Sequence, residues 1–346
     1  MLYQQINPHG GDTFGRSDAP DFSANINPFG MPEPIREALI RSVDAAAAYP
    51  DPYCRALKAA LAEKKGLDPD ALLFGNGAAE LIFQFAASLP KGKKARIVCP
   101  TFSEYETALQ AAGIPAEPLF LSEEKDFVPD EDLLRADPGD CSALFVCTPN
   151  NPTGLVLPAD LLEKLAGRYP AVLCDLSFLE LSDRPEQYDI PALLTRHPNI
   201  VFLFSFTKSF AIPGIRLGCA VCGDKARLQK MSEKAPCWNV SVPAQAAGLA
   251  ALGCEDWLRD CAARIRKERE RLKKELSACG LKVWDSEANF LFFYSKKPLA
   301  AALAEKNILI RDCSNFRNLT EGYCRIAVKM PPENDRLIAA VREVLV

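Results

Sequence analysis

Short apolar runs alternate with amphipathic segments through most of the chain. The apolar runs have the length of buried strands, and the segments between them repeat apolar residues at the spacing of helices. The expected strands are Arg96–Cys99, Ala143–Cys147, Val172–Asp175 and Val201–Phe204, and the expected helices between them are Ala78–Leu89, Glu104–Ala112 and Pro158–Arg168. Because parallel neighbours need helical crossovers, this alternation predicts an α/β protein with a mostly parallel sheet flanked by helices.

Composition divides the chain into three stretches. Residues 1–32 are rich in glycine, proline, asparagine and aspartate and are expected to form an irregular N-terminal arm. The alternating pattern of residues 33–240 predicts a large domain. Residues 241–346 are expected to form a smaller α/β domain, entered through a long connecting helix from about Val242 to Ala278. Its expected strands are Asn289–Tyr294, Ile308–Ile310 and Cys324–Val328, and its expected helices are Leu299–Glu305 and Glu333–Leu345.

Charge, hydropathy and cysteine content indicate which kinds of partner, compartment and metal site to expect. The 346 residues carry a net charge of −4, which provides no overall basic field for nucleic acid or an anionic membrane. No apolar run approaches the ~20 residues that cross a bilayer, and no signal peptide is visible. The 13 cysteines lie mostly in apolar contexts, which indicates a reducing cytoplasm. Cys219 and Cys222 are spaced as Cys-x-x-Cys, but side chains three apart on a strand face opposite ways, so we expect no metal site.

The loop after one expected strand carries the most telling chemical group. Lys208 lies in the sequence Ser205-Phe206-Thr207-Lys208, directly after a buried apolar run. A lysine at such a position can form a Schiff base with an aldehyde if its neighbours lower its pKa. Ser205, Thr207 and Arg216 suit a phosphate, so the segment favours pyridoxal 5'-phosphate (PLP), an aldehyde that carries a phosphate. A solvated lysine in a turn is the alternative.

Four further loops offer groups that this cofactor needs. Gly77-Ala78 opens a helix whose backbone N–H groups would hold a phosphate. Phe102, favoured by position over Tyr105, would stack on a flat ring. Asn151 lies in a loop fixed by two prolines and a glycine and would hold a ring hydroxyl. Asp175 ends an apolar run, and a protonated pyridine nitrogen would be its cationic partner. A plain turn is the alternative for Gly77-Ala78 and for the loop of Asn151, core packing is the alternative for Phe102, and a helix cap is the alternative for Asp175.

The order of these residues, each beyond its own strand, resembles the fold-type I PLP enzymes of the aspartate aminotransferase superfamily. The resemblance implies that Lys208 forms the Schiff base, Asp175 pairs with the pyridinium and Asn151 binds the ring hydroxyl. The remaining cofactor-binding residues that it implies are Gly77, Ala78, Phe102, Ser205, Thr207 and Arg216. Tyr49, in Tyr49-Pro50-Asp51-Pro52, matches a tyrosine that reaches the phosphate of the neighbouring subunit, so a homodimer is implied.

Within that superfamily the chain resembles the threonine-phosphate decarboxylases of cobalamin biosynthesis and the histidinol-phosphate aminotransferases. His9-Gly10-Gly11, the stretch 21–30 and the stretch 308–316 are similar to decarboxylase segments, and Phe178 stands where these aminotransferases usually carry tyrosine. The resemblance implies decarboxylation of L-threonine O-3-phosphate to (R)-1-amino-2-propanol O-2-phosphate. The substrate-binding residues that it implies are His9, Gly10, Asn25, Asn151, Arg311 and Arg325, with the two arginines on the carboxylate and phosphate.

Three other interpretations stay open at this point. The chain could be a histidinol-phosphate or related aminotransferase that uses 2-oxoglutarate, or a decarboxylase of phosphoserine, whose missing methyl is worth about 1–3 kcal/mol in a pocket. A PLP-fold protein reused as a binding or regulatory module is disfavoured by the combination of Lys208, Asp175 and Arg216. Leu176 and Ser177 depart from the family pattern, which has glutamate and alanine after the cofactor aspartate.

Overall fold

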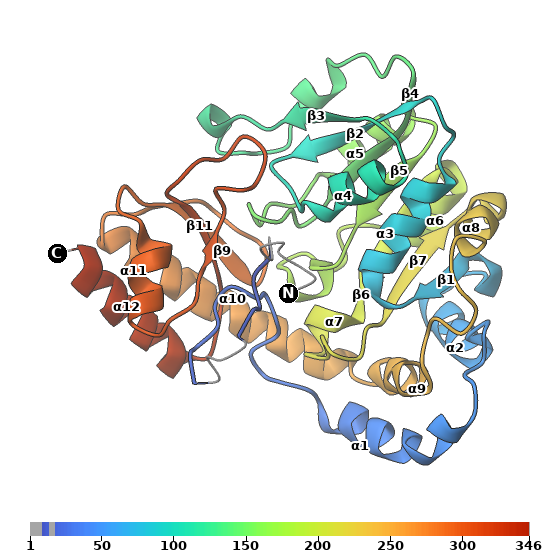
Figure 1. Ribbon diagram of the computed structural model, residues 1–346, viewed down its shortest axis with the longest axis horizontal. Helices are drawn as coiled ribbons and strands as arrows, with labels where there is room; N and C mark the ends of the chain where they lie inside the picture. Colours follow the sequence, from blue (N-terminus) through green and yellow to red (C-terminus); the bar gives the residue numbers. More distant parts are fainter. Residues whose placement is uncertain (1–8, 14–17, 346) are drawn as a thin grey trace, which may run out of the picture.

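The computed structural model describes residues 9–13 and 18–345, whose elements form two sheets of unequal size (Figure 1). Seven strands make a large sheet, and four strands toward the C-terminus make a small one. We call the parts of the chain around them the large region and the small region. The α/β architecture with a mostly parallel large sheet was predicted, whereas the division into an arm and two domains at residues 32 and 240 stays a prediction.

The large sheet has the strand order β1-β7-β6-β5-β4-β2-β3. Its strands are β1 (Leu72–Gly75), β2 (Lys94–Cys99), β3 (Ala116–Phe120), β4 (Cys141–Cys147), β5 (Val172–Asp175), β6 (Ile200–Ser205) and β7 (Gly218–Cys222). The five strands from β6 to β3 pair in parallel, while β7 is antiparallel to both β6 and β1. Since β1 therefore points the same way as these five, six strands end at one edge, beyond which such sheets bind ligands.

Helices cover both faces of the large sheet and enclose two separate cores. One core is covered by α3 (Gly77–Ser88), α4 (Glu104–Ala111) and α8 (Lys225–Ser232), the other by α2 (Arg55–Lys65), α5 (Ala159–Ala166) and α6 (Ile190–Arg196). Side chains alternate between the cores along each strand, so that Cys219 and Cys222 of β7 lie in opposite cores, as predicted. Among the described residues, no group of three or more His, Cys, Asp or Glu side chains is placed to hold a metal ion.

The long helix predicted from Val242 to Ala278 is in fact two helices. α9 (Val242–Ala251) packs on α1 (Glu33–Ser42), and α10 (Glu255–Ala278) crosses from there to the small sheet (Figure 1). A turn at residues 252–254 separates them, in which the Gly253 N–H donates to the Ala250 oxygen over 3.1 Å. No helix within the described ranges is long and apolar enough to cross a membrane.

The small sheet is antiparallel and has the order β10-β11-β9-β8. The strands of this sheet are β8 (Lys282–Val283), β9 (Phe290–Tyr294), β10 (Arg311–Asp312) and β11 (Tyr323–Ala327), and the helices of the small region are α11 (Leu299–Glu305) and α12 (Pro331–Leu345). The segment predicted as a strand at Ile308–Ile310 is not part of this sheet: β10 begins at Arg311, and Leu309 instead pairs with the N-terminal arm. Asp21 forms a bridge with Leu309, and the Phe22 N–H donates to the Leu309 oxygen over 2.8 Å. The arm is thereby attached to the small region.

Candidate active site

A cavity of about 210 Å³ lies beyond the carboxyl ends of the parallel strands, between the two regions and under the arm. The loops after β1, β2, β4, β5 and β6 all reach it. The sequence-predicted residues that line it are His9, Gly10, Asn25, Ala78, Phe102, Asn151, Asp175, Ser205, Thr207, Lys208, Arg216, Arg311 and Arg325. Residues far apart in the sequence thus meet at one place because parallel strands end at one edge.

Lys208 is carried by α7 (Phe206–Ser209), a single helical turn directly after β6. Burial lowers the pKa of its amine, and the Asp175 carboxylate opposes that shift. The Lys208 nitrogen lies 5.6 Å from the centre of the Phe178 ring, and its backbone oxygen accepts a 3.1 Å hydrogen bond from the Asn27 N–H of the arm. A lysine with a lowered pKa presents more of the neutral amine that attacks an aldehyde.

Asp175 is buried at the end of β5 and accepts two hydrogen bonds. The Tyr105 hydroxyl donates to its Oδ2 over 2.7 Å, and the Ser177 N–H donates to its Oδ1 over 2.9 Å. Sequence reasoning missed this role of Tyr105, although its spacing of three from Phe102 was a usable signal. Phe102 lies just before α4 and Tyr105 in its first turn, and both line the cavity. Ser177 stands two positions after Asp175, where the family pattern has alanine. Its contact with Asp175 uses the backbone N–H, which an alanine would also provide.

A cradle for an anion lies between β1, β7 and α7. Gly77 has φ +83°, and a Cβ there would lie 2.7 Å from Nη2 of Arg216. A Cβ on Gly218 would lie 2.4 Å from the Ala78 nitrogen, so the strand and the start of α3 approach as closely as glycine allows. The buried hydroxyl oxygen of Ser205 has no hydrogen-bond partner among the described residues. The amides at the start of α3, a guanidinium and an unused hydroxyl fit the phosphate of PLP.

The two asparagines in the loop after β4 make different contacts. Asn150 fixes the loop: its amide nitrogen donates to the Pro100 oxygen over 2.9 Å, and its Oδ1 accepts from the Thr101 hydroxyl over 2.8 Å. Asn151 faces the cavity, where its Oδ1 accepts a 2.5 Å hydrogen bond from Nη1 of Arg325. This arrangement explains why asparagine occurs twice in succession.

Arg325 extends from β11 into the cavity and is almost fully buried. Its Nη2 donates to the Ser23 oxygen over 2.5 Å, while its Nε has no hydrogen-bond partner among the described residues. Burial lowers the pKa of the guanidinium to about 10. A buried cation without a facing carboxylate is costly, so this geometry suits an anionic ligand.

Arg311 stands at the rim of the cavity, beside β11 in the small sheet. Its guanidinium carbon lies 5.0 Å from the centre of the Phe316 ring, and its Nη2 donates to Asn315 Oδ1 over 2.7 Å. Burial lowers the pKa of this guanidinium as well. The small region therefore presents two guanidinium groups to the same cavity.

The arm forms the remaining wall. Nε2 of His9 lies 2.8 Å from Oε1 of Glu104, and the His9 ring is 5.4 Å from that of Phe102. A Cβ on Gly10 would lie 2.3 Å from the Ser23 oxygen, which accounts for glycine there. Both polar atoms of the Asn25 side chain are buried without a hydrogen-bond partner in the described part of the chain.

Gly77 does not line the cavity itself but lies against Arg216, which does. Tyr49 is the predicted site residue that the structure places elsewhere. It lies on the surface with 79% of its area exposed, and its ring stacks on that of Trp238 at a centroid distance of 4.5 Å. Its predicted role concerns the neighbouring subunit, so that role stays a prediction.

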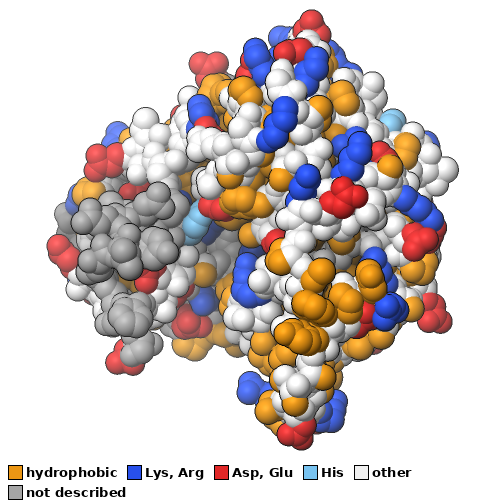
Figure 2. Space-filling model, turned by 45° about the vertical axis from the view of Figure 1, so that its right-hand side comes forward, with side chains coloured by type: hydrophobic (Ala, Val, Ile, Leu, Met, Phe, Trp, Pro, Cys, Tyr) orange, Lys and Arg blue, Asp and Glu red, His pale blue; other side chains and the backbone are white. Residues whose placement is uncertain are grey.

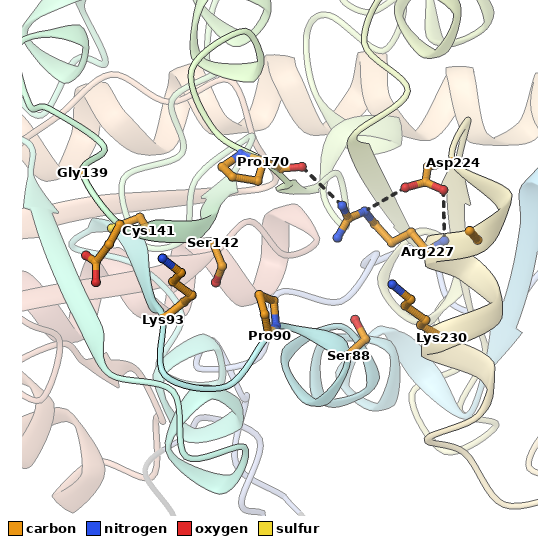
Figure 3. Close-up of a pocket in the computed structure, with 12 residues that line it drawn as sticks. Ser88, Pro90, Lys93, Gly139, Cys141, Ser142, Pro170, Asp224, Arg227 and Lys230 are labelled. Atoms are coloured by element: carbon orange, nitrogen blue, oxygen red, sulfur yellow. Dashed lines mark hydrogen bonds and ion pairs between the residues drawn. The ribbon is translucent and has the colours of Figure 1, made fainter.

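A larger hollow of about 540 Å³ opens at the opposite edge of the large sheet, beside the starts of β2 and β4 (Figure 3). Arg227 lies in its wall, with Nη2 3.3 Å from the Pro170 oxygen and Nε 3.7 Å from the Asp224 carboxylate. This hollow contains none of the sequence-predicted residues. Chemistry, not size, therefore identifies the smaller cavity as the candidate active site.

Known proteins resemble the chain over most of its length. A model of the family described as aminotransferase class I and II matches residues 18–341. A threonine-phosphate decarboxylase of Salmonella typhimurium is 37% identical over 94% of this chain and 91% of its own length. A histidinol-phosphate aminotransferase of Archaeoglobus fulgidus is 33% identical over 98% of both chains. The crystal structure of a histidinol-phosphate aminotransferase from Clostridium acetobutylicum superimposes with a TM-score of 0.88 at 26% identity, covering 94% of this chain and 99% of that one.

Proposed function

Because the chain belongs to the aminotransferase class I and II family, it is a PLP-dependent enzyme, and we propose that it decarboxylates L-threonine O-3-phosphate. The observation that carries the proposal is the pair of guanidinium groups, Arg325 and Arg311, that the small region presents to the cavity containing Lys208. A substrate with both a carboxylate and a phosphate matches that pair. The 37% identity to a threonine-phosphate decarboxylase supports the same substrate.

The cofactor would be held by residues of the large region alone. Lys208 would bind its aldehyde, Asp175 its ring nitrogen, Asn151 its ring hydroxyl and Phe102 one face of its ring. Its phosphate would lie in the cradle of Ser205, Thr207, Arg216 and the Gly77-Ala78 amides. PLP, when bound, supplies an electron sink for the bond that breaks at Cα of the substrate.

The substrate would be held from the small region and the arm. Arg325, whose Nε is unused, would take the carboxylate or the phosphate in a charge-assisted hydrogen bond, and Arg311 would take the other group. The side-chain nitrogen and oxygen of Asn25, in the same wall, have no hydrogen-bond partner among the described residues, and both suit the polar groups of the ligand. His9 and Gly10 would close the arm over it and exclude water.

Asp175 and Lys208 are the two residues to which we assign roles in proton binding and transfer. Asp175, held in place by the Tyr105 hydroxyl and the Ser177 N–H, would face the ring nitrogen of the cofactor and favour a proton on it. Lys208 would return one proton to Cα after carbon dioxide has left, since its lowered pKa makes its ammonium form a ready donor. The product would be (R)-1-amino-2-propanol O-2-phosphate, which serves the side chain of cobalamin.

A histidinol-phosphate or related aminotransferase is the second candidate, supported by the relative at 33% identity. The same lysine, aspartate and arginines would serve it, because the choice between losing carbon dioxide and losing a proton depends on which Cα bond is held perpendicular to the cofactor ring. Phe178 favours the decarboxylase, since its ring packs edge-on against Phe290 at 5.1 Å and offers no hydroxyl near Lys208. Phosphoserine would fit the same pocket with one methyl fewer.

We also propose that the enzyme is a homodimer. Exposed apolar side chains gather on α1, on α9 and in the segments beside them: Ile40, Val43, Tyr49, Tyr53, Trp238 and Leu249. Hydrophobic side chains are concentrated on the lower part of the face in Figure 2, where α1 and α9 lie. Patches of this kind mark protein interfaces. In such a dimer Tyr49 would reach the cofactor phosphate of the partner.

Product analysis tests the proposed reaction. The purified enzyme loaded with PLP is incubated with phosphothreonine, with phosphoserine, or with histidinol phosphate plus 2-oxoglutarate, and carbon dioxide and keto acids are measured. We expect carbon dioxide from phosphothreonine without any added keto acid. Keto acid produced without carbon dioxide would replace the decarboxylase by the aminotransferase. Arg311→Ala should weaken phosphorylated substrates far more than PLP, and an equal loss of both would contradict the role given to Arg311.

A further inference from the structure

An ion pair joins the small region to the large one close to the cavity, each partner being the neighbour in sequence of a lining residue, Phe316 or Tyr105. Nε of Arg317, in the loop between β10 and β11, donates to Oε2 of Glu106 on α4 over 2.6 Å, and Nη2 of Arg317 donates to Oε1. The pair is therefore bidentate, the geometry in which an arginine–carboxylate contact is most specific. It lowers the pKa of Glu106 and raises that of Arg317. The side chains are 22% and 47% exposed, so the contact can open without stranding a buried charge.

On the small region, Arg317 belongs to a short loop that also fixes Arg311. The Phe316 N–H donates to the Cys313 oxygen over 3.0 Å, and the Leu319 N–H donates to the Phe316 oxygen over 3.1 Å. Asn315 and Phe316, the two residues before Arg317, both contact the Arg311 guanidinium. Holding Arg317 in place therefore also restricts the position of the Arg311 guanidinium, because the loop that contacts it is held by its own hydrogen bonds.

On the large region, Glu106 belongs to the first turn of α4, which touches three other parts of the site. Tyr105 donates to Asp175, Glu104 contacts His9 of the arm, and Phe102, just before the helix, lines the cavity. The ion pair thus attaches the loop of Arg311 to the same helical turn that contacts the cofactor aspartate.

We propose that Glu106 and Arg317 are positioning residues that set the distance between Arg311 and the cofactor site, and so determine affinity for phosphorylated amines. The inference rests on the proposed function and takes, of the two assignments left open there, the one in which Arg311 holds the phosphate. A second pair, Arg269 with Asp183, is buried where α10 meets the large region, with Nη2 to Oδ2 at 2.6 Å. The Arg269 side chain is only 2% exposed and also contacts Glu270 and the Ala288 oxygen, so separating that pair would disturb a buried network. The pair of Arg317 and Glu106 is partly exposed and can open and close.

Charge reversal tests the proposal. Arg317→Glu, Glu106→Arg and the double variant with both changes are compared with wild-type enzyme loaded with PLP. Arg196→Glu is the matched control: Arg196 makes a bidentate pair with Glu163, at 2.9 Å for both contacts and with 51% and 31% exposure, entirely within the large region. The readouts are the Kd of phosphothreonine and of histidinol phosphate, taken from the change in cofactor absorption, the Kd of PLP, and the midpoint of thermal unfolding.

Each single reversal should raise the Kd of both phosphorylated amines by about threefold to tenfold, because an exposed attraction becomes a repulsion. The Kd of PLP and the unfolding midpoint should change no more than in Arg196→Glu, and the double variant should recover most of the lost affinity. Reversals that leave the Kd unchanged, or a double variant that binds no better than either single one, would overturn the proposal. If wild-type enzyme binds neither amine, the proposed function fails instead.

Discussion

Replacing Tyr105 by phenylalanine removes one hydroxyl from beneath the cavity and leaves the packed ring in place. That hydroxyl donates a 2.7 Å hydrogen bond to Asp175, and both residues are buried. Burial raises the pKa of Tyr105 well above its usual value, so the hydroxyl remains a donor throughout any ordinary assay range. A hydrogen bond to a charged group contributes about 1.5–3 kcal/mol, and Asp175 would retain the Ser177 N–H.

We therefore expect the free energy of unfolding of the PLP-free variant to fall by about 1.5–3 kcal/mol, as measured in urea. If about 1.4–2.8 kcal/mol of this contact is used in the transition state, kcat should fall roughly tenfold to hundredfold. KM should change little, since the Tyr105 hydroxyl donates to Asp175 and, within the described ranges, forms no hydrogen bond with Arg311 or Arg325.

Tyr188→Phe is the control for this experiment. Tyr188 is also buried, but its hydroxyl contacts two neutral groups, the Leu157 oxygen at 2.5 Å and the Thr148 hydroxyl at 2.9 Å. Its loss should cost about 0.5–1.5 kcal/mol of stability and leave kcat within about twofold of wild type. If Tyr105→Phe has no larger effect than this control on stability and kcat, the assigned support of Asp175 is wrong.

Three further predictions concern the cofactor and the carboxylate. Gly77→Ala should weaken PLP binding about tenfold in a titration, since a Cβ would lie 2.7 Å from Arg216 and the positive φ costs about 1–2 kcal/mol; unchanged affinity would refute the cradle. Because burial lowers its pKa, Lys208 is neutral at lower pH than an ordinary lysine, so the rate of PLP incorporation should level off at lower pH than acetylation of the lysine side chain in a model peptide; coincident profiles would contradict this. Arg325→Lys should raise KM about tenfold to hundredfold, because one ammonium cannot replace its fork of donors, and an unchanged KM would count against its role.

Much of the site could be predicted because it depends on local sequence and on one topological rule. Asp175, Lys208 and Asn151 each follow an apolar run in a loop of small, polar or conformationally restricted residues. Once the runs are taken as parallel strands, their ends must meet at one edge. The mostly parallel sheet followed from the same alternation of apolar runs and helices.

The features that escaped prediction depend on tertiary pairing. The segment 308–310 has the pattern of a strand, but its partner is the arm, and no local signal shows that Leu309 pairs with Asp21. The break between α9 and α10 lies in a sequence with helical character, where a single Gly253 is tolerated in many helices. The hydroxyl of Tyr105 and the ion pair of Arg317 with Glu106 each join residues at least 70 positions apart. Such contacts arise from the packed fold and leave no periodic pattern.

The central claim is that the amine of Lys208 is the point at which PLP is attached, and reductive labelling tests it most directly. The enzyme is reconstituted with PLP, reduced with borohydride, digested and analysed by mass spectrometry, with Lys208→Ala treated in parallel. We predict a pyridoxyl group on the peptide that contains Lys208 and none at the corresponding peptide of the variant. A label at another lysine, or an unlabelled Lys208 peptide from fully reconstituted enzyme, would contradict the account.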